Sequence, residues 1–137
     1  MFLLDTNVVS ELRKPKPHGA VVEWISGIAA DALYLSVVTL GEIQRGIERT
    51  RAQDAAKAQL LTDWANALAS ASNVIDADAA IFRRHACLMY GTTHDLWEDA
   101  LIAATALEKG LTIATRNVRD FATFAVDVID PFSFGSR

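Results

Sequence analysis

Short apolar runs alternate with helix-forming segments along the whole chain, and this alternation restricts the fold more than any other feature of the sequence. The runs span residues 2–4, 33–37, 73–75, 111–114 and 126–129. Short, largely apolar runs of this kind are typical of buried strands in a parallel sheet that helices cover on both faces. We therefore predict an α/β fold, with a mainly parallel central sheet between two layers of helices.

Helical spacing and composition predict helices over residues 8–13, 18–28 and 52–71. Further helix starts are expected where capping residues follow a strand or a loop. These are Thr39 with Glu42 as a capping box, Asp76, and Asp95 with Glu98. Gly110 is expected to end the helix that contains Asp99.

The helix after Asp76 is predicted to be buried along one side. That side is formed by Ala79, Phe82, Ala86 and Met89. Cys87 lies in the same helix and is interpreted as a small core residue.

The composition indicates one globular domain. The chain has 137 residues, 51% of them hydrophobic and 22% charged, which is enough apolar material for a sizeable core. Cys87 is the only cysteine, so a disulfide framework and a cysteine zinc cluster are both excluded within one chain. No run is apolar enough to cross a membrane and no signal-peptide pattern precedes Asp5, so a cytoplasmic protein is expected.

The net charge of −4 disfavours a protein that binds nucleic acid by a basic surface alone. A metal-dependent nuclease is not excluded by this charge. Bound cations offset the charge of an acidic site and supply the attraction for phosphate.

Acidic and amide side chains stand where strands end or helices begin. Asp5 directly follows the first apolar run, Glu42 follows the second across a tight turn, and Asp99 begins a helix. Asn117 and Asp120 follow the run 111–114. Each position also has a structural explanation, because acids stabilise helix N-termini. A shared site at the carboxyl edge of the sheet explains all of them together.

Oxygen ligands without histidine or cysteine suit Mg²⁺ or Mn²⁺, and these ions support phosphodiester hydrolysis. The three histidines lack ligand-like spacing, so zinc is not expected. Several basic residues are candidates for contact with a phosphate backbone. They are Arg13, Lys14, Arg45 and Arg116, with Lys16 and Arg49 nearby. A solvated turn explains the cluster at residues 13–16 equally well, and pairing with nearby glutamates explains Arg45 and Arg49.

Four segments together resemble the PIN-domain ribonuclease family, in particular the VapC/FitB-type toxins of toxin–antitoxin systems. They are Leu-Leu-Asp-Thr-Asn at 3–7, Thr-x-x-Glu at 39–42, Asp-Ala-Leu-Ile-Ala-Ala-Thr at 99–105 and Thr-Arg-Asn-x-x-Asp-Phe at 115–121. They occur in the family's order over nearly the whole chain. The resemblance implies a single PIN domain over residues 1–137, with a PIN-like three-layer sandwich.

The resemblance also implies a metal-dependent endoribonuclease toxin that cuts structured RNA, either tRNA or rRNA, and so inhibits translation. It implies Mg²⁺ as the cofactor, with Mn²⁺ as a substitute. The implied catalytic residues are Asp5, Glu42, Asp99 and Asn117, of which Asp5, Glu42 and Asp99 are metal ligands. Thr6, Thr115 and Asp120 are implied as supporting residues. Some family members have Asp where this chain has Asn117, which removes one charge from the metal site.

The implied partners are a cognate antitoxin protein, the RNA substrate and a second copy of the chain in a homodimer. Contact with DNA is expected only through the antitoxin complex. Two alternatives remain. Asn117 leaves open a non-catalytic PIN-like binding module, and the strand followed by Asp5 also fits a haloacid-dehalogenase-type phosphatase. The phosphatase normally has a second Asp two residues later, where this chain has Asn7.

Overall fold

The computed structural model describes residues 1–135 and confirms the predicted α/β architecture. Its five strands are all parallel and lie in the order β3-β2-β1-β4-β5. They are β1 (Phe2–Leu4), β2 (Leu33–Ser36), β3 (Asn73–Ile75), β4 (Thr112–Ala114) and β5 (Val128–Ile129). The N-terminal strand is therefore the middle of the sheet, where Leu3 pairs with Tyr34 on one side and with Ile113 on the other.

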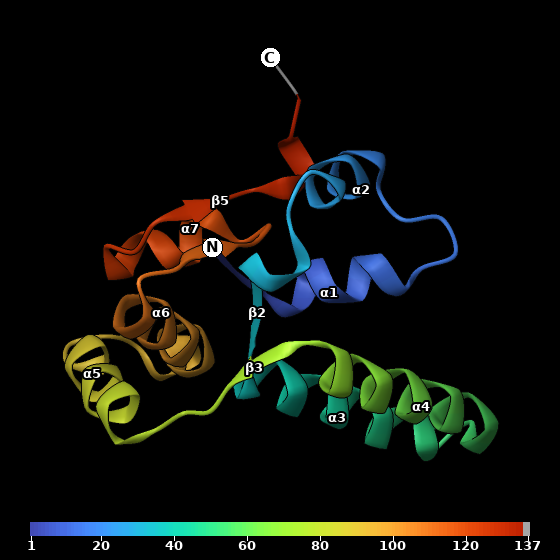
Figure 1. Cartoon of the computed structure of the whole chain (residues 1–137). Helices are drawn as coiled ribbons and strands as arrows, with labels where there is room; N and C mark the ends of the chain where they lie inside the picture. The colour runs from blue at the N-terminus through green and yellow to red at the C-terminus, as the bar shows by residue number, and fades with distance from the viewer. Residues whose placement is uncertain (136–137) are drawn as a thin grey trace.

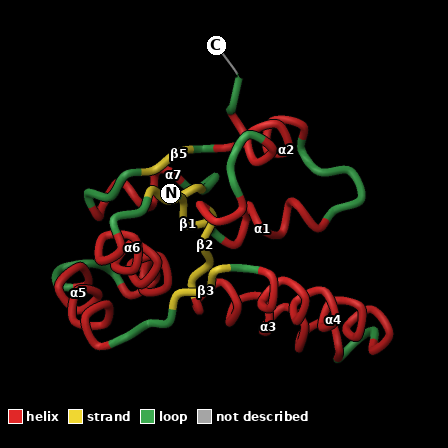
Figure 2. Tube along the Cα trace, in the orientation of Figure 1, coloured by secondary structure: helices red, strands yellow, loops and turns green. Residues whose placement is uncertain are grey.

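Helices and short 3₁₀ turns connect the strands (Figures 1 and 2). The helices are α1 (Thr6–Arg13), α2 (Gly19–Ser26), α3 (Val37–Arg51), α4 (Ala55–Ala71), α5 (Ala79–Met89), α6 (Trp97–Lys109) and α7 (Val118–Phe121). The 3₁₀ turns are η1 (Ala30–Ala32), η2 (His94–Leu96), η3 (Ala122–Phe124) and η4 (Pro131–Ser133). Within residues 1–135, each helix is too short or too polar to cross a bilayer.

Two hydrophobic cores lie on opposite faces of the sheet, because successive residues of a strand point to opposite sides. Leu3 and Ile113 face a core that α6, α7 and η3 complete, whereas Leu4 and Ala114 face a core formed with α1 to α4. Figure 1 shows the corresponding layers, with α5 to α7 on one side of the strands and α1 to α4 on the other. The prediction of a three-layer sandwich is confirmed.

The predicted helix caps were wrong at three positions. Ser36, not Thr39, caps α3, and its hydroxyl accepts the Val38 backbone N–H at 3.0 Å. Asp78, not Asp76, caps α5. The N-cap of α6 is Leu96, without a side-chain hydrogen bond, so Asp95 has no capping role. At α3, Val37 and Val38 have the β-branched side chains of a strand, but they form the first helical turn.

The buried side predicted for α5 was also wrong. Ile81 and His85 are the buried residues of this helix, whereas Phe82 is 44% exposed and Cys87 is exposed. His85 occupies a core position because its Nε2 pairs with the Trp97 carbonyl oxygen at 3.0 Å. The buried face of α5 therefore includes a polar residue, His85. A prediction from apolar residues alone misses this face.

The strand order creates a crevice at the carboxyl edge of the sheet. From β1 the chain proceeds to β2 and β3 on one side, and then returns to place β4 and β5 on the other. In open parallel sheets, ligands bind at such a switch point, outside the carboxyl ends of the strands. Here the residues that follow β1 and β4 are Asp5 and Thr115.

Candidate active site

Asp5 is the most tightly held acid of the crevice, with only 4% of its surface exposed. Its Oδ1 accepts the Thr6 backbone N–H at 2.8 Å, and its Oδ2 accepts the Thr115 hydroxyl at 2.8 Å. Asn7 Nδ2 also donates to Oδ2, at 3.2 Å. Burial raises the pKa of Asp5 above its ordinary value, and these hydrogen bonds oppose the rise. The carboxylate is therefore fixed in one orientation at the end of β1.

Asn7 is a positioning residue that the sequence analysis did not include in the site. Its amide donates to both Asp5 and Thr115, and its Oδ1 accepts the Arg116 backbone N–H at 3.1 Å. It thereby connects the segment after β1 with the segment after β4. The signals for this role in the sequence were its place two residues after Asp5 and its position in the segment Leu-Leu-Asp-Thr-Asn at 3–7.

Glu42 reaches the crevice from α3 and not through the predicted capping box. Its Oε1 accepts the Thr6 hydroxyl at 3.0 Å, and that hydroxyl is also 3.3 Å from the fully buried Thr39 hydroxyl. Burial raises the pKa of Glu42, the hydrogen bond from Thr6 lowers it, and the negative charges of Asp5, Glu98 and Asp99 raise it. Thr6 therefore connects α1 to the acid of α3.

Asp99 lies half-buried in the first turn of α6, as predicted. Burial raises its pKa to about 6, and the negative charges of Asp5, Asp120 and Glu98 add to the rise. Among residues 1–135, no donor forms a hydrogen bond with the Asp99 carboxylate. It is therefore the acid of the crevice whose charge is least compensated by the protein.

The structure separates the roles of Asn117 and Asp120. Asn117 is exposed, and its backbone N–H donates to the Thr115 hydroxyl at 2.9 Å, which completes the hydrogen bonds of Thr115. Its side chain forms no hydrogen bond among the described residues. Asp120, also exposed, is close enough for its charge to raise the pKa of both Asp5 and Asp99. The negative field at this end of the crevice thus comes from Asp120.

The four basic residues predicted to contact RNA have different surroundings. Lys14 and Arg45 form ion pairs, the first with Glu11 at 3.0 Å and the second with Glu98 at 2.6 Å. Arg116 stacks on the ring of Phe132 at 4.3 Å. Arg13 lines a groove that begins at the acids. Of these four residues, Arg13 and Arg116 are therefore the two outside the ion pairs formed by the described residues.

The chemistry of the crevice fits a divalent cation. Asp5, Glu42 and Asp99 are hard oxygen donors from three separate segments, and the pKa of each is raised in part by the negative charge of other acids. A bound cation removes that repulsion. As their side chains are placed, no three acids, histidines or cysteines of residues 1–135 are grouped closely enough to hold an ion. Binding of a cation by all three acids therefore requires their side chains to move closer together.

Residues 2–126 match the family model of the PIN domain. The chain belongs to the PIN-domain family. This assignment confirms the family that the four sequence segments indicated. It rules out the alternative of a haloacid-dehalogenase-type phosphatase.

Individual PIN-domain relatives match this chain over nearly its full length. The VapC ribonuclease Y4jK of Sinorhizobium fredii is 36% identical and covers 96% of this chain and 98% of its own. The crystal structure of FitAcB from Neisseria gonorrhoeae includes a chain that is 30% identical, with a TM-score of 0.85 and coverage of 96% and 99% of the two chains. A toxin–antitoxin complex from Klebsiella pneumoniae includes one that is 25% identical, with a TM-score of 0.67 and coverage of 96% and 98%.

Replacement of Thr115 by Val is expected to lower the free energy of unfolding at pH 7 by about 1.5–3 kcal/mol, because it removes the hydroxyl that donates to the Asp5 carboxylate. Urea unfolding measures this change. Thr115→Ser retains the hydroxyl and loses only a methyl group, so it is expected to cost about 0.8 kcal/mol. A Val variant as stable as wild type would mean that Asp5 does not need this hydrogen bond.

Asp99→Asn is expected to stabilise the metal-free protein at pH 7 but not at pH 4. The folded-state pKa of Asp99 is about 6, above its ordinary value of 3.8. Folding is therefore favoured by protonation of Asp99, and this stability is full below about pH 3.8 and is lost as the pH rises through 6. At pH 7 the variant avoids the loss, which is on the order of 1 kcal/mol after allowance for solvent screening.

The measurement is urea unfolding of both proteins in EDTA at a series of pH values. Asp5 and Glu42 titrate in both proteins, so the difference between the two curves reports the titration of Asp99 together with the effect of its charge on the pKa of Glu42. A difference that does not change with pH would contradict the raised pKa.

Proposed function

We propose that this PIN domain is a metal-dependent endoribonuclease, the toxin of a toxin–antitoxin pair. One observation carries the proposal. The carboxylates of Asp5, Glu42 and Asp99, from three separate segments, converge on one crevice, where the pKa of each is raised. Membership of a family that includes a VapC ribonuclease supports hydrolysis of RNA as the reaction.

Asp5, Glu42 and Asp99 are proposed to hold Mg²⁺ or Mn²⁺, which supplies activation of water and neutralises charge that develops on the phosphate. The surrounding residues have supporting roles. Thr115 and Asn7 hold the Asp5 carboxylate in place, and Thr6 orients Glu42. Asp120 adds negative charge that favours a cation, while Asn117 contributes an amide where a carboxylate would bind the cation more strongly.

The proposed partners follow the relatives. The Klebsiella pneumoniae structure is a toxin–antitoxin complex, so we expect an antitoxin protein to bind this chain, and contact with DNA to occur through that protein. A homodimer, a tRNA or rRNA substrate and action in the cytoplasm are further parts of the proposal.

Cleavage of total RNA by the antitoxin-free protein tests this function. With Mg²⁺ or Mn²⁺ we expect discrete fragments, and in EDTA intact RNA. End-mapping of the fragments then identifies the target. Intact RNA in every condition, from protein that is folded by circular dichroism, would favour the alternative of a non-catalytic binding module.

A further inference from the structure

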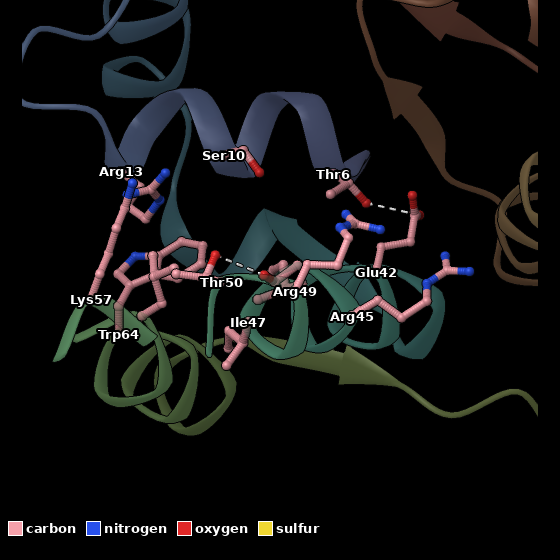
Figure 3. Close-up of a pocket in the computed structure, with 13 residues that line it drawn as sticks. Thr6, Ser10, Arg13, Glu42, Arg45, Ile47, Arg49, Thr50, Lys57 and Trp64 are labelled. Carbon is pink, nitrogen blue, oxygen red and sulfur yellow. Dashed lines mark hydrogen bonds between the residues drawn. The ribbon is translucent and has the colours of Figure 1, made fainter. Parts of the chain in front are cut away.

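A groove leads away from the acids between α1, α3 and α4. It has a volume of about 380 Å³ and begins at Thr6 and Glu42 (Figure 3). Arg13, Arg49 and Lys57 line its further part, and we call these residues the groove cations. A second cavity, which shares Arg49 and Lys57 with the groove, continues it outward past Asp54.

Helical spacing explains why the groove is acidic at one end and basic along the rest. On α1, Thr6 and Arg13 are seven residues apart and share a face, and on α3 the same is true of Glu42 and Arg49. Seven residues of helix span about 10 Å. Since both helices start at the carboxyl edge of the sheet, each has its polar or acidic residue in the crevice and its cation about two turns away.

Arg49 extends back toward the acids. Its Nη2 lies 3.9 Å from the place where a Cβ on Gly46 would be, so Gly46 leaves a smooth helix surface beneath the guanidinium. Figure 3 shows the Arg49 side chain directed toward Glu42, and Arg13 and Lys57 at the other end of the groove. The groove is therefore lined by positive charge from the edge of the crevice outward.

Within residues 1–135, the groove cations form no ion pair with an acidic side chain. The ion pairs among residues 1–135 involve Lys14, Arg45, Arg51 and Arg84, and none involves a groove cation. Asp54 is nearby, but its Oδ1 accepts the Lys57 backbone N–H as the cap of α4. Arg13 has its guanidinium carbon 5.8 Å from the Trp64 ring centroid, which positions it without neutralising it. Three cations that line one groove without forming ion pairs repel one another and favour an anion.

We propose that this groove binds the RNA strand that continues from the scissile phosphate, with Arg13, Arg49 and Lys57 as its phosphate contacts. The inference rests on the proposed ribonuclease function and extends it. The groove cations are spread along a path and not gathered at one point. This arrangement suits a polymer with regularly spaced phosphates better than a ligand with a single anionic group. The path starts at the proposed reaction centre, so one continuous strand contacts both. RNA therefore enters from the side of α1, α3 and α4.

RNA binding by Asp99→Asn protein without divalent metal tests the proposal without cleavage. The probe is a fluorescein-labelled single-stranded RNA of about 12 nucleotides, followed by anisotropy at several salt concentrations. In this background, Arg13→Gln, Arg49→Gln and Lys57→Gln are each expected to weaken binding 3- to 10-fold, roughly the effect of one lost phosphate contact. Each is also expected to reduce the salt slope by about 0.7.

Arg83→Gln is the matched control, because Arg83 is exposed on α5, outside the groove and outside the ion pairs of the described residues. It is expected to bind RNA as the Asp99→Asn protein does. Thermal melting confirms that each variant is folded. A labelled oligoglutamate peptide of equal charge is titrated in parallel.

Two results would overturn the proposal. One is equal RNA affinity and salt slope for the groove variants and Arg83→Gln. The other is groove-dependent binding of the peptide but not of the RNA, which would assign the groove to an acidic protein segment. Failure of the ribonuclease function is a separate result, namely absence of metal-dependent cleavage by wild type, whatever the binding data show.

Discussion

Asp5→Asn and Asp99→Asn are each expected to reduce RNA cleavage by at least about 100-fold, which corresponds to roughly 2.7 kcal/mol of transition-state stabilisation. Each change removes a charged oxygen donor proposed to hold the metal and leaves the side-chain size unchanged. Both rates are measured on the same RNA at saturating Mg²⁺. Expression of the variants in cells is correspondingly expected to cause no growth arrest.

The matched control for these variants is Asp63→Asn, the same chemical change at an exposed position of α4. It is expected to cleave RNA at the wild-type rate. Circular dichroism separates loss of activity from loss of folding. Wild-type cleavage or growth arrest by well-expressed Asp5→Asn protein would count decisively against a role for this acid in the reaction.

Phe121→Ala is expected to cost about 3–5 kcal/mol of unfolding free energy, the usual range for removal of a fully buried phenyl ring. Phe121 is 0% exposed and packs in the same core as Leu3 and Ile113. It is the last residue of α7, the helix that carries Asp120. The total free energy of unfolding of a natural domain is only about 5–15 kcal/mol, so a large share of the stability depends on this ring.

Urea unfolding followed by tryptophan fluorescence measures the effect. Phe134→Ala is the control, because Phe134 is 45% exposed and its removal is expected to cost under about 1 kcal/mol. Equal losses in the two variants would mean that Phe121 does not anchor α7 in the core.

The architecture, the position of Asp5 after a strand and the position of Asp99 at the start of a helix could be predicted from the sequence because they depend on short-range patterns. A buried strand followed by an acid places Asp5 at the carboxyl edge of a parallel sheet, whatever the order of the neighbouring strands. A different short-range pattern, a helix-forming run that a glycine ends, places Asp99 in the first turn of α6 and Gly110 at its end, where the backbone has φ +66°. None of these predictions requires knowledge of a distant contact.

The details that failed depend on contacts between segments remote in sequence. Glu42 and Glu98 each appeared to be part of a capping box, but Glu42 accepts from Thr6 of α1, and Glu98 pairs with Arg45 of α3. Sequence spacing cannot distinguish an acid that caps its own helix from one that reaches another. Arg45 was predicted to contact RNA for the same reason, since its acidic partner Glu98 becomes its neighbour only after folding. Lys14 differs, because its partner Glu11 is three residues away in the sequence.

The hydrogen bond from Thr115 to Asp5 joins residues 110 positions apart, and it has a consequence for biosynthesis. A ribosome that has joined the first hundred residues has already incorporated Asp5, Glu42 and Asp99, but not β4 or the hydroxyl that fixes Asp5. Domains fold as units during synthesis, at about 5–20 residues per second. The proposed reaction centre therefore assembles only when translation of the chain is almost finished. If the proposed toxin function holds, a product truncated before residue 115 is expected to cause no growth arrest in the cell that makes it.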